Sequence, residues 1–138
     1  MMMSVSDTTG PDWEALMARA SEAMSRAYAP YSGYPVGAAG AVDDGRVVHG
    51  ANVENASYGL TLCAECSMVS QLIDTGGGAL TAVVCVDGSG AVIMPCGRCR
   101  QLIAEHAGPE CVLMTPQGPL AMEAVLPLAF GPDDLAQN

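Results

Sequence analysis

The run LTAVVCV, residues 80–86, decides the fold. It is an apolar stretch bounded by turn residues, which is typical of a strand buried on both faces of a sheet. Helices are predicted before and after it along the chain, over 62–75 and around Gln101–His106. Glycines end the first helix at Gly76–Gly78, and Gly108-Pro109 ends the second. The strand therefore lies at the centre of an α/β arrangement.

Outside this centre, the chain continues to alternate helices with short strands. Apolar residues at helical spacing predict an amphipathic helix over 13–27. Further strands are predicted at Val36–Val42, Val47–Asn52, Ala91–Met94 and Cys111–Met114, followed by a turn over Thr115–Pro119. This order favours a three-layer α/β/α assembly around one mixed sheet. We expect a flexible N-terminus over 1–10 and a single domain over 11–138.

The composition narrows the class of partner. The 138 residues include 15 acidic side chains against five arginines and no lysine, giving a formal net charge of −10. Such a chain lacks the basic patches that nucleic acids and anionic membranes attract, so we expect neither as a partner. Neither a secretory leader nor an apolar run of membrane length is visible, which favours the cytoplasm. Half of the residues are apolar, which favours an oligomer.

Four of the six cysteines form two C-x-x-C pairs, Cys63 with Cys66 and Cys96 with Cys99. Each pair stands where a predicted helix begins, and helix N-termini stabilise thiolates. In a reducing compartment, this pattern indicates a zinc site rather than disulfides. A structural four-cysteine zinc site and a dithiol redox centre are the alternatives. The long gap between the pairs and the position of Glu65 inside the first pair count against both alternatives.

Glu65 favours a hydrolytic zinc site. A catalytic zinc keeps three protein ligands and one position for water, and a neighbouring carboxylate moves the protons. Cys96 and Cys99 are the first two expected ligands. Cys63 is the third expected ligand, because only this choice leaves Glu65 as a neighbour of the metal; with Cys66 as the ligand, Glu65 would be blocked from that position. The pattern C-x-E followed by P-C-x-x-C is typical of zinc-dependent deaminases.

Beyond the metal motif, the chain resembles the short cytidine deaminases of pyrimidine nucleoside salvage. The matching segments are AYAPYSGYPVGAA, NVENASYGLTLCAE, PCGRCRQ and LPLAFGPDDL, spread over roughly residues 27–135. The resemblance implies an α/β fold, a three-layer α/β/α cytidine-deaminase-like domain with a central mixed five-stranded sheet. It also implies one Zn²⁺ per subunit on Cys63, Cys96 and Cys99, Glu65 as the catalytic residue, and a homotetramer.

The same resemblance assigns residues that bind the substrate. Asn52 and Glu54, from the N-x-E-N motif, would hold the ribose hydroxyls, because an amide and a carboxylate together suit groups that both donate and accept. Tyr34 and Tyr58 would line the base pocket. Backbone groups of Ala64 would hold the edge of the base.

Phe130, in the apolar LPLAFGP tail, matches an aromatic residue that reaches a neighbouring subunit's active site in tetrameric members; a core anchor for the tail is the alternative. Two positions depart from the family pattern. Tyr34 stands where phenylalanine is usual, and the ring is kept. Cys66, expected to be a neutral packed thiol, stands where most members carry an arginine that offsets the charge of the zinc thiolates. By hypothesis, Arg98 or Arg100 supplies that charge here.

Together these residues predict hydrolytic deamination of cytidine and 2′-deoxycytidine to uridine and 2′-deoxyuridine plus ammonia, by zinc-activated water with Glu65 as proton shuttle. The alternative substrate is another small cytosine-containing molecule such as blasticidin S. A nucleic-acid editor is disfavoured by the charge, and a non-catalytic zinc module is the remaining rival. Cys85 and Cys111 are expected to be small buried hydrophobes.

Overall fold

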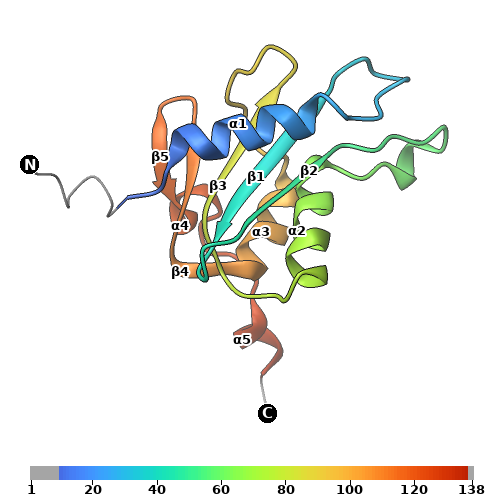
Figure 1. Cartoon of the computed structure of the whole chain (residues 1–138). Helices are drawn as coiled ribbons and strands as arrows, with labels where there is room; N and C mark the ends of the chain where they lie inside the picture. Colours follow the sequence, from blue (N-terminus) through green and yellow to red (C-terminus); the bar gives the residue numbers. More distant parts are fainter. Residues whose placement is uncertain (1–9, 137–138) are drawn as a thin grey trace, which may run out of the picture.

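The computed structural model describes residues 10–136, and a mixed five-stranded sheet forms its centre (Figure 1). The strands are β1 (Val36–Val42), β2 (Val47–Ala51), β3 (Leu80–Asp87), β4 (Ala107–Thr115) and β5 (Gly118–Ala121). Their order across the sheet is β2-β1-β3-β4-β5. Strands β3 and β4 are parallel, and the other neighbouring pairs are antiparallel. The predicted mixed sheet is confirmed.

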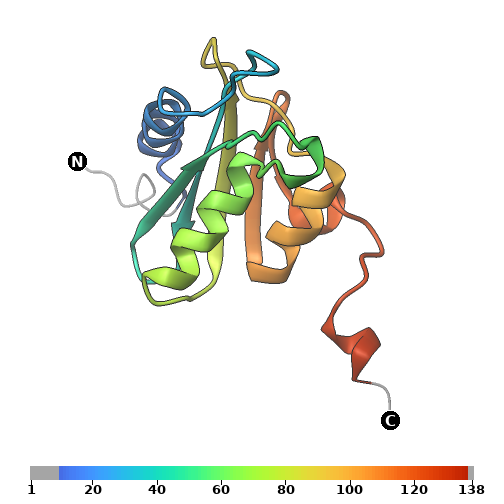
Figure 2. The ribbon, with the colours of Figure 1, turned by 90° about the vertical axis from the view of Figure 1, so that its right-hand side faces the viewer.

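Helices cover both faces of the sheet. Helix α1 (Trp13–Met24) lies on one face, and α2 (Ala64–Asp74) and α3 (Gly97–His106) lie on the other (Figure 2). The short elements are η2 (Tyr58–Leu60), α4 (Met122–Val125) and α5 (Pro132–Leu135). The predicted three-layer α/β/α fold is therefore confirmed.

The apolar run in β3 explains why two helical layers can pack on one sheet. Successive side chains of a strand point to opposite faces. Val84 and Val86 accordingly join the core beneath α1, whereas Val83 and Cys85 join the core beneath α2 and α3. All four side chains are fully buried. Each buried valine stabilises the fold by roughly 1.5–3 kcal/mol relative to an exposed one.

Two glycines allow the helices to approach the sheet closely. A methyl group on Gly37 of β1 would lie 1.9 Å from the carbonyl oxygen of Ala20 in α1. A methyl group on Gly50 of β2 would lie 2.4 Å from the backbone nitrogen of Met68 in α2. These distances are shorter than atoms tolerate, so any side chain at Gly37 or Gly50 would push a helix off the sheet.

The topology brings the N-termini of α2 and α3 together. The chain leaves the carboxyl end of β3, folds back briefly and enters α3, which returns it to the parallel strand β4. Helix α2 begins at the same end of the sheet (Figure 2). In open α/β sheets, the space outside the carboxyl ends of parallel strands is where ligands usually bind.

One predicted strand was placed wrongly. Ala91–Met94 does not form a ladder, because only Val92 pairs, through an isolated bridge to Val86. The side chain of Asp87 accepts hydrogen bonds from the backbone of Ser89 and Ala91, which folds this segment into a tight turn.

The fifth strand is instead β5, which overlaps the end of the segment predicted to be a turn. The chain reverses at Gly118, whose φ of 113° favours glycine, and pairs Met114 with Pro119. Proline is tolerated there because β5 is an edge strand.

Most of the N-terminus predicted to be flexible, residues 1–9, lies outside the described residues, as do residues 137–138. The assignment of 11–138 to a single domain stays a prediction. Among the helices of residues 10–136, none has the length and apolar character needed to cross a membrane.

Candidate active site

Three cysteine sulfurs meet where α2 and α3 begin. Cys63 is the N-cap of α2, Cys96 is the N-cap of α3, and Cys99 lies in the first turn of α3. The three Sγ atoms all lie within 4.8 Å of one another, and those of Cys63 and Cys96 are 4.0 Å apart. The ligands expected from the sequence are thus brought together by two helices.

The surroundings of the cluster affect its thiols differently. Burial raises the pKa of Cys63 and that of Cys99. Burial acts the same way on Cys96, but hydrogen bonds outweigh it and lower the pKa of Cys96. They come from the backbone and thiol of Cys99, the thiol of Cys63 and the backbone of Arg98. Three thiols this close cannot all ionise alone, because their negative charges repel. A dication removes that obstacle.

Zinc fits this cluster. A tetrahedral zinc about 2.3 Å from each sulfur holds the sulfurs roughly 3.8 Å apart, close to the separations seen here. Soft thiolates are ligands that zinc prefers. Because only three sulfurs converge, the fourth position stays free, as in catalytic rather than structural zinc sites. The cysteine cluster therefore has the ligand type and number that fit a catalytic zinc site.

The remaining cysteine of the two pairs, Cys66, lies outside the cluster. It is half-buried, and its Sγ accepts a hydrogen bond from Nη2 of Arg98 at 3.2 Å. Arg100 turns elsewhere and donates to the carbonyl oxygens of Pro95 and Val125. Arg98, and not Arg100, is therefore the arginine that contacts position 66.

Glu65 lies two residues after Cys63 and is 4% exposed. It lies in the first turn of α2 and points inward, so that its Oε2 is 3.1 Å from the Sγ of Cys85 on β3. Cys85 was expected to be a plain core hydrophobe. It is fully buried, but its thiol also contacts the candidate catalytic carboxylate.

A hollow of about 220 Å³ opens beside these groups. Its lining comprises Val36, Asn52, Thr61, Cys63, Ala64, Glu65, Ile93, Met94 and Cys96. Apolar walls with a few polar groups are typical of small-molecule sites. Asn52 already accepts from the N–H of Val36 and donates to the carbonyl of Tyr34. One amide hydrogen and one lone pair remain available on Asn52.

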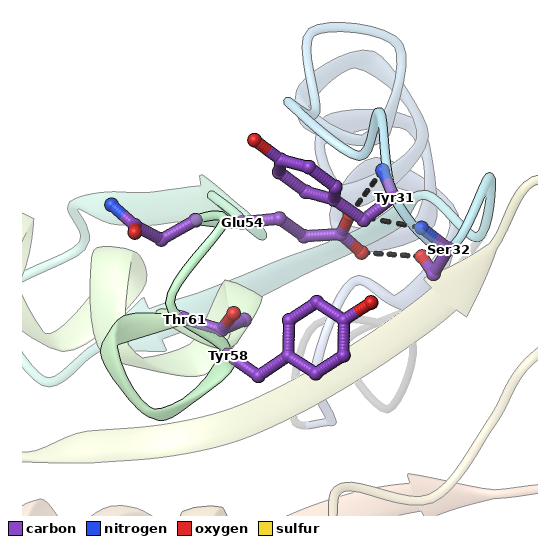
Figure 3. A pocket seen from close by; sticks show the side chains of 6 residues that line it. Tyr31, Ser32, Glu54, Tyr58 and Thr61 are labelled. Atoms are coloured by element: carbon purple, nitrogen blue, oxygen red, sulfur yellow. Dashed lines mark hydrogen bonds between the residues drawn. The ribbon is translucent and has the colours of Figure 1, made fainter.

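A second hollow of about 260 Å³ adjoins the first and shares Thr61 with it. Figure 3 shows the Glu54 carboxylate in this hollow, directed at the loop of Tyr31 and Ser32. It accepts from the N–H of Tyr31 at 2.9 Å, the N–H of Ser32 at 3.1 Å and the Ser32 hydroxyl. The Ser32 hydroxyl and these two N–H groups lower the pKa of Glu54.

The predicted substrate residues are thus divided. Asn52 and Ala64 line the hollow beside the cysteines, whereas Glu54 and Tyr58 line the adjoining one. The Tyr58 ring is 77% exposed and meets the Tyr31 ring edge-on, with centroids 6.3 Å apart.

Tyr34 and Phe130 lie outside the lining of both hollows. Each is more than half exposed, at 51% and 59%. The tail is attached near Phe130, whose carbonyl accepts from the side chain of Gln101. Because Phe130 is exposed, it does not anchor the tail in the core of its own chain, and that alternative is wrong.

Several lining residues carried no signal in the sequence. Three of them belong to no motif and line the hollow because of where the loops around them lie: Thr61, Ile93 and Met94. Ser32 was passed over in the same way, although it holds Glu54. A serine opposite a carboxylate more than twenty positions away has no periodicity to reveal it.

Comparison with known proteins assigns the family. Residues 11–115 match the model of the cytidine and deoxycytidylate deaminase zinc-binding region. The chain is 58% identical over 127 residues to a cytidine deaminase of Mycobacterium tuberculosis (strain ATCC 25618 / H37Rv), covering 92% of this chain and 96% of the relative. A cytidine deaminase of Sporosarcina psychrophila is 38% identical, covering 91% and 96%. The crystal structure of cytidine deaminase from Mycobacterium leprae superposes with a TM-score of 0.83 at 59% identity, covering 86% and 99%. The chain therefore belongs to the cytidine and deoxycytidylate deaminase family.

Proposed function

We propose that the protein deaminates cytidine and 2′-deoxycytidine as free nucleosides, releasing uridine or 2′-deoxyuridine and ammonia. The observation that carries this proposal is a buried carboxylate, Glu65, beside three converging thiols in an apolar hollow of about 220 Å³. A structural zinc site needs neither the free fourth position nor the carboxylate. The net charge of −10 suits a neutral nucleoside better than a nucleic acid.

The reaction replaces the amino group at C4 of the pyrimidine with oxygen from water. Cys63, Cys96 and Cys99 would hold a zinc ion, whose Lewis acidity would lower the pKa of water at this position. Glu65 accepts one proton from water and delivers it to N3 of the base. It then accepts the second proton from the new C4 hydroxyl and passes it to the amino group, which leaves as ammonia while the C4 carbonyl forms. Its burial keeps bulk water from competing for those protons. Backbone groups of Ala64 hold the edge of the base.

Asn52 and Glu54 hold the ribose hydroxyls in this proposal. The support is the hydrogen-bonding capacity that each side chain keeps after making its bonds within the protein. Asn52 keeps one donor and one acceptor. Glu54 accepts three hydrogen bonds from Tyr31 and Ser32, and a carboxylate has about four acceptor positions, so one remains for a hydroxyl. The brace fixes Glu54 before the sugar arrives, which lowers the entropy cost of binding.

Tyr34, Tyr58 and Phe130 complete the pocket in a homotetramer. The support is their exposure: the three rings are 51%, 77% and 59% exposed, more apolar surface than a site contained in one chain would leave uncovered. Phe130 then enters the pocket of a neighbouring subunit. We also place the protein in the cytoplasm, consistent with six cysteines that are all free thiols.

The decisive experiment compares the wild type with Glu65→Gln. Deamination is followed by the loss of cytidine absorbance and by ammonia release, and zinc is counted in both proteins. We expect Glu65→Gln to keep its zinc and to lose about 10²–10⁴-fold in kcat. Equal rates in the two proteins would make the catalytic proposal wrong. Turnover of blasticidin S with none of cytidine would favour the alternative substrate.

A further inference from the structure

The thiol of Cys85 and the carboxylate of Glu65 form a buried pair beneath the cysteine cluster. The Sγ of Cys85 donates to Oε2 of Glu65 at 3.1 Å. Cys85 is 0% exposed and Glu65 is 4% exposed. A thiol is a weak donor, but a hydrogen bond to a charged acceptor counts for more where little water competes.

The two side chains reach each other from different layers of the fold. Glu65 comes from the first turn of α2, and Cys85 comes from the face of β3 that α2 covers. The backbone of Cys85 is held on both sides, because it pairs with Ala38 of β1 and its carbonyl accepts from the N–H of Ile93 at 3.0 Å. The backbone that carries the donor is therefore hydrogen-bonded to neighbours on both sides.

We propose that Cys85 is a positioning residue that holds the Glu65 carboxylate by Oε2 and leaves Oε1 to exchange protons with the substrate. This inference rests on the proposed deamination. Within residues 10–136, Cys85 is the one hydrogen-bond partner of this carboxylate. The last torsion of a glutamate side chain has no sharp preference, so a single contact decides which oxygen faces the hollow.

Cys85 holds Glu65 without taking part in the proton transfers. Burial, reinforced by the neighbouring charge of Glu65, raises the pKa of Cys85 well above its ordinary value. The thiol therefore keeps its hydrogen and can only donate to the carboxylate. No atom of Cys85 is exchanged in the reaction, so its contribution is to the orientation of Glu65 alone.

The test removes the donor and then restores it. We expect Cys85→Ala to lower kcat about five- to tenfold, the range of one hydrogen bond, with KM changed by less than about twofold. Cys85→Ser brings back a donor and recovers most of the rate. Cys111→Ala is the matched control, because Cys111 is also a buried strand thiol but does not contact a carboxylate. Zinc content and the urea midpoint are measured for each variant.

Two results would overturn the inference: a folded, zinc-loaded Cys85→Ala with the wild-type kcat, or a Cys85→Ser as slow as Cys85→Ala. If Cys85→Ala does not fold, Cys85→Val replaces it under the same criteria, since valine leaves no cavity and lacks a donor. A wild type that releases no ammonia from cytidine would overturn the proposed function and this inference with it. An active wild type with unaffected variants would overturn the inference alone.

Discussion

The guanidinium of Arg98 donates to the sulfur of Cys66 across the first turns of α3 and α2, with Nη2 and Sγ 3.2 Å apart. The interaction with Cys66, and then the charges of Cys63 and Cys99, raise the pKa of Arg98. The family resemblance implies an arginine at position 66 itself. Here the cation reaches the same place from the neighbouring helix, so position 66 can be a cysteine without leaving the thiolates uncompensated.

Arg98→Gln should weaken zinc retention. Three thiolates and one Zn²⁺ leave a net charge of −1, and removing the nearby cation leaves that charge less stabilised. We expect zinc to pass to a chelator about ten times more readily than from the wild type, as is typical when an outer-shell partner is lost. The measurement is zinc transfer to a coloured chelator at fixed pH.

A double variant provides the control. Cys66→Arg combined with Arg98→Gln moves the cation back to the position that is usual in the family, so zinc retention should recover. Retention that stays low in the double variant, or is normal in Arg98→Gln alone, would contradict this account of the Arg98–Cys66 pair.

Most of the fold was predictable because its signals are local. The apolar run of β3, the helical spacing in α1 and the glycines after α2 each act within a few residues. The placement of the fifth strand failed for a physical reason. An edge strand such as β5 needs only one partner, so its sequence can contain a proline and is not distinguished from a turn.

The convergence of three cysteines was also predictable. The C-x-x-C spacing places Cys96 and Cys99 at the start of one helix, and Glu65 beside Cys63 distinguishes Cys63 from Cys66. The contacts of Glu54 and Glu65 were not predictable. Ser32 is 22 residues from Glu54, and Cys85 is 20 residues from Glu65. Such pairs form only when β-strands and loops from distant parts of the chain are placed side by side. No local pattern in a single sequence predicts that placement.

Gly37→Ala should destabilise the protein. The added methyl group would lie 1.9 Å from the carbonyl oxygen of Ala20, so α1 must move away from β1. We expect a loss of about 1–3 kcal/mol in the free energy of unfolding, the usual cost of overpacking. Gly59→Ala is the control, since a methyl group there meets no atom within 4 Å. Equal urea midpoints for Gly37→Ala and Gly59→Ala would show that this close approach does not constrain the fold.

The brace between Glu54 and the loop of Ser32 should make stability depend on pH. The lowered pKa of Glu54 means that the folded state favours the charged carboxylate. Its contribution is therefore present above the unfolded value of about 4.5 and is lost as the pH falls through the lower folded value. The wild type should be more stable than Glu54→Gln at neutral pH, and the gap should close as the pH falls below the unfolded value of about 4.5. Urea titrations across this range measure it, and Ser32→Ala should reduce the dependence. A gap that does not change with pH would contradict the prediction.

Phe130 provides the sharpest test of shared pockets. In the proposed tetramer, one subunit's Glu65 works with a neighbour's Phe130, so two damaged chains can repair each other. Phe130→Ala alone should lose most of its kcat/KM, and Glu65→Gln alone should be inactive. In an equal mixture that assembles at random, about half of the pockets have their own Glu65, and about half of those receive a Phe130 from a neighbour. Co-expression should then restore about a quarter of the wild-type rate.

If Phe130 lies in the pocket of its own chain, a different deamination rate is expected for the co-expressed mixture. If Phe130 served the pocket of its own chain, every Glu65-containing pocket in the mixture would still carry Phe130→Ala. The mixed sample would then show only about half the low rate of Phe130→Ala alone, because half of its pockets would be dead. Mixing the two proteins after separate assembly provides the baseline, since no hybrid pockets exist in that sample. A co-expressed rate above this baseline can arise only where a ring from one subunit completes the carboxylate and thiol site of another.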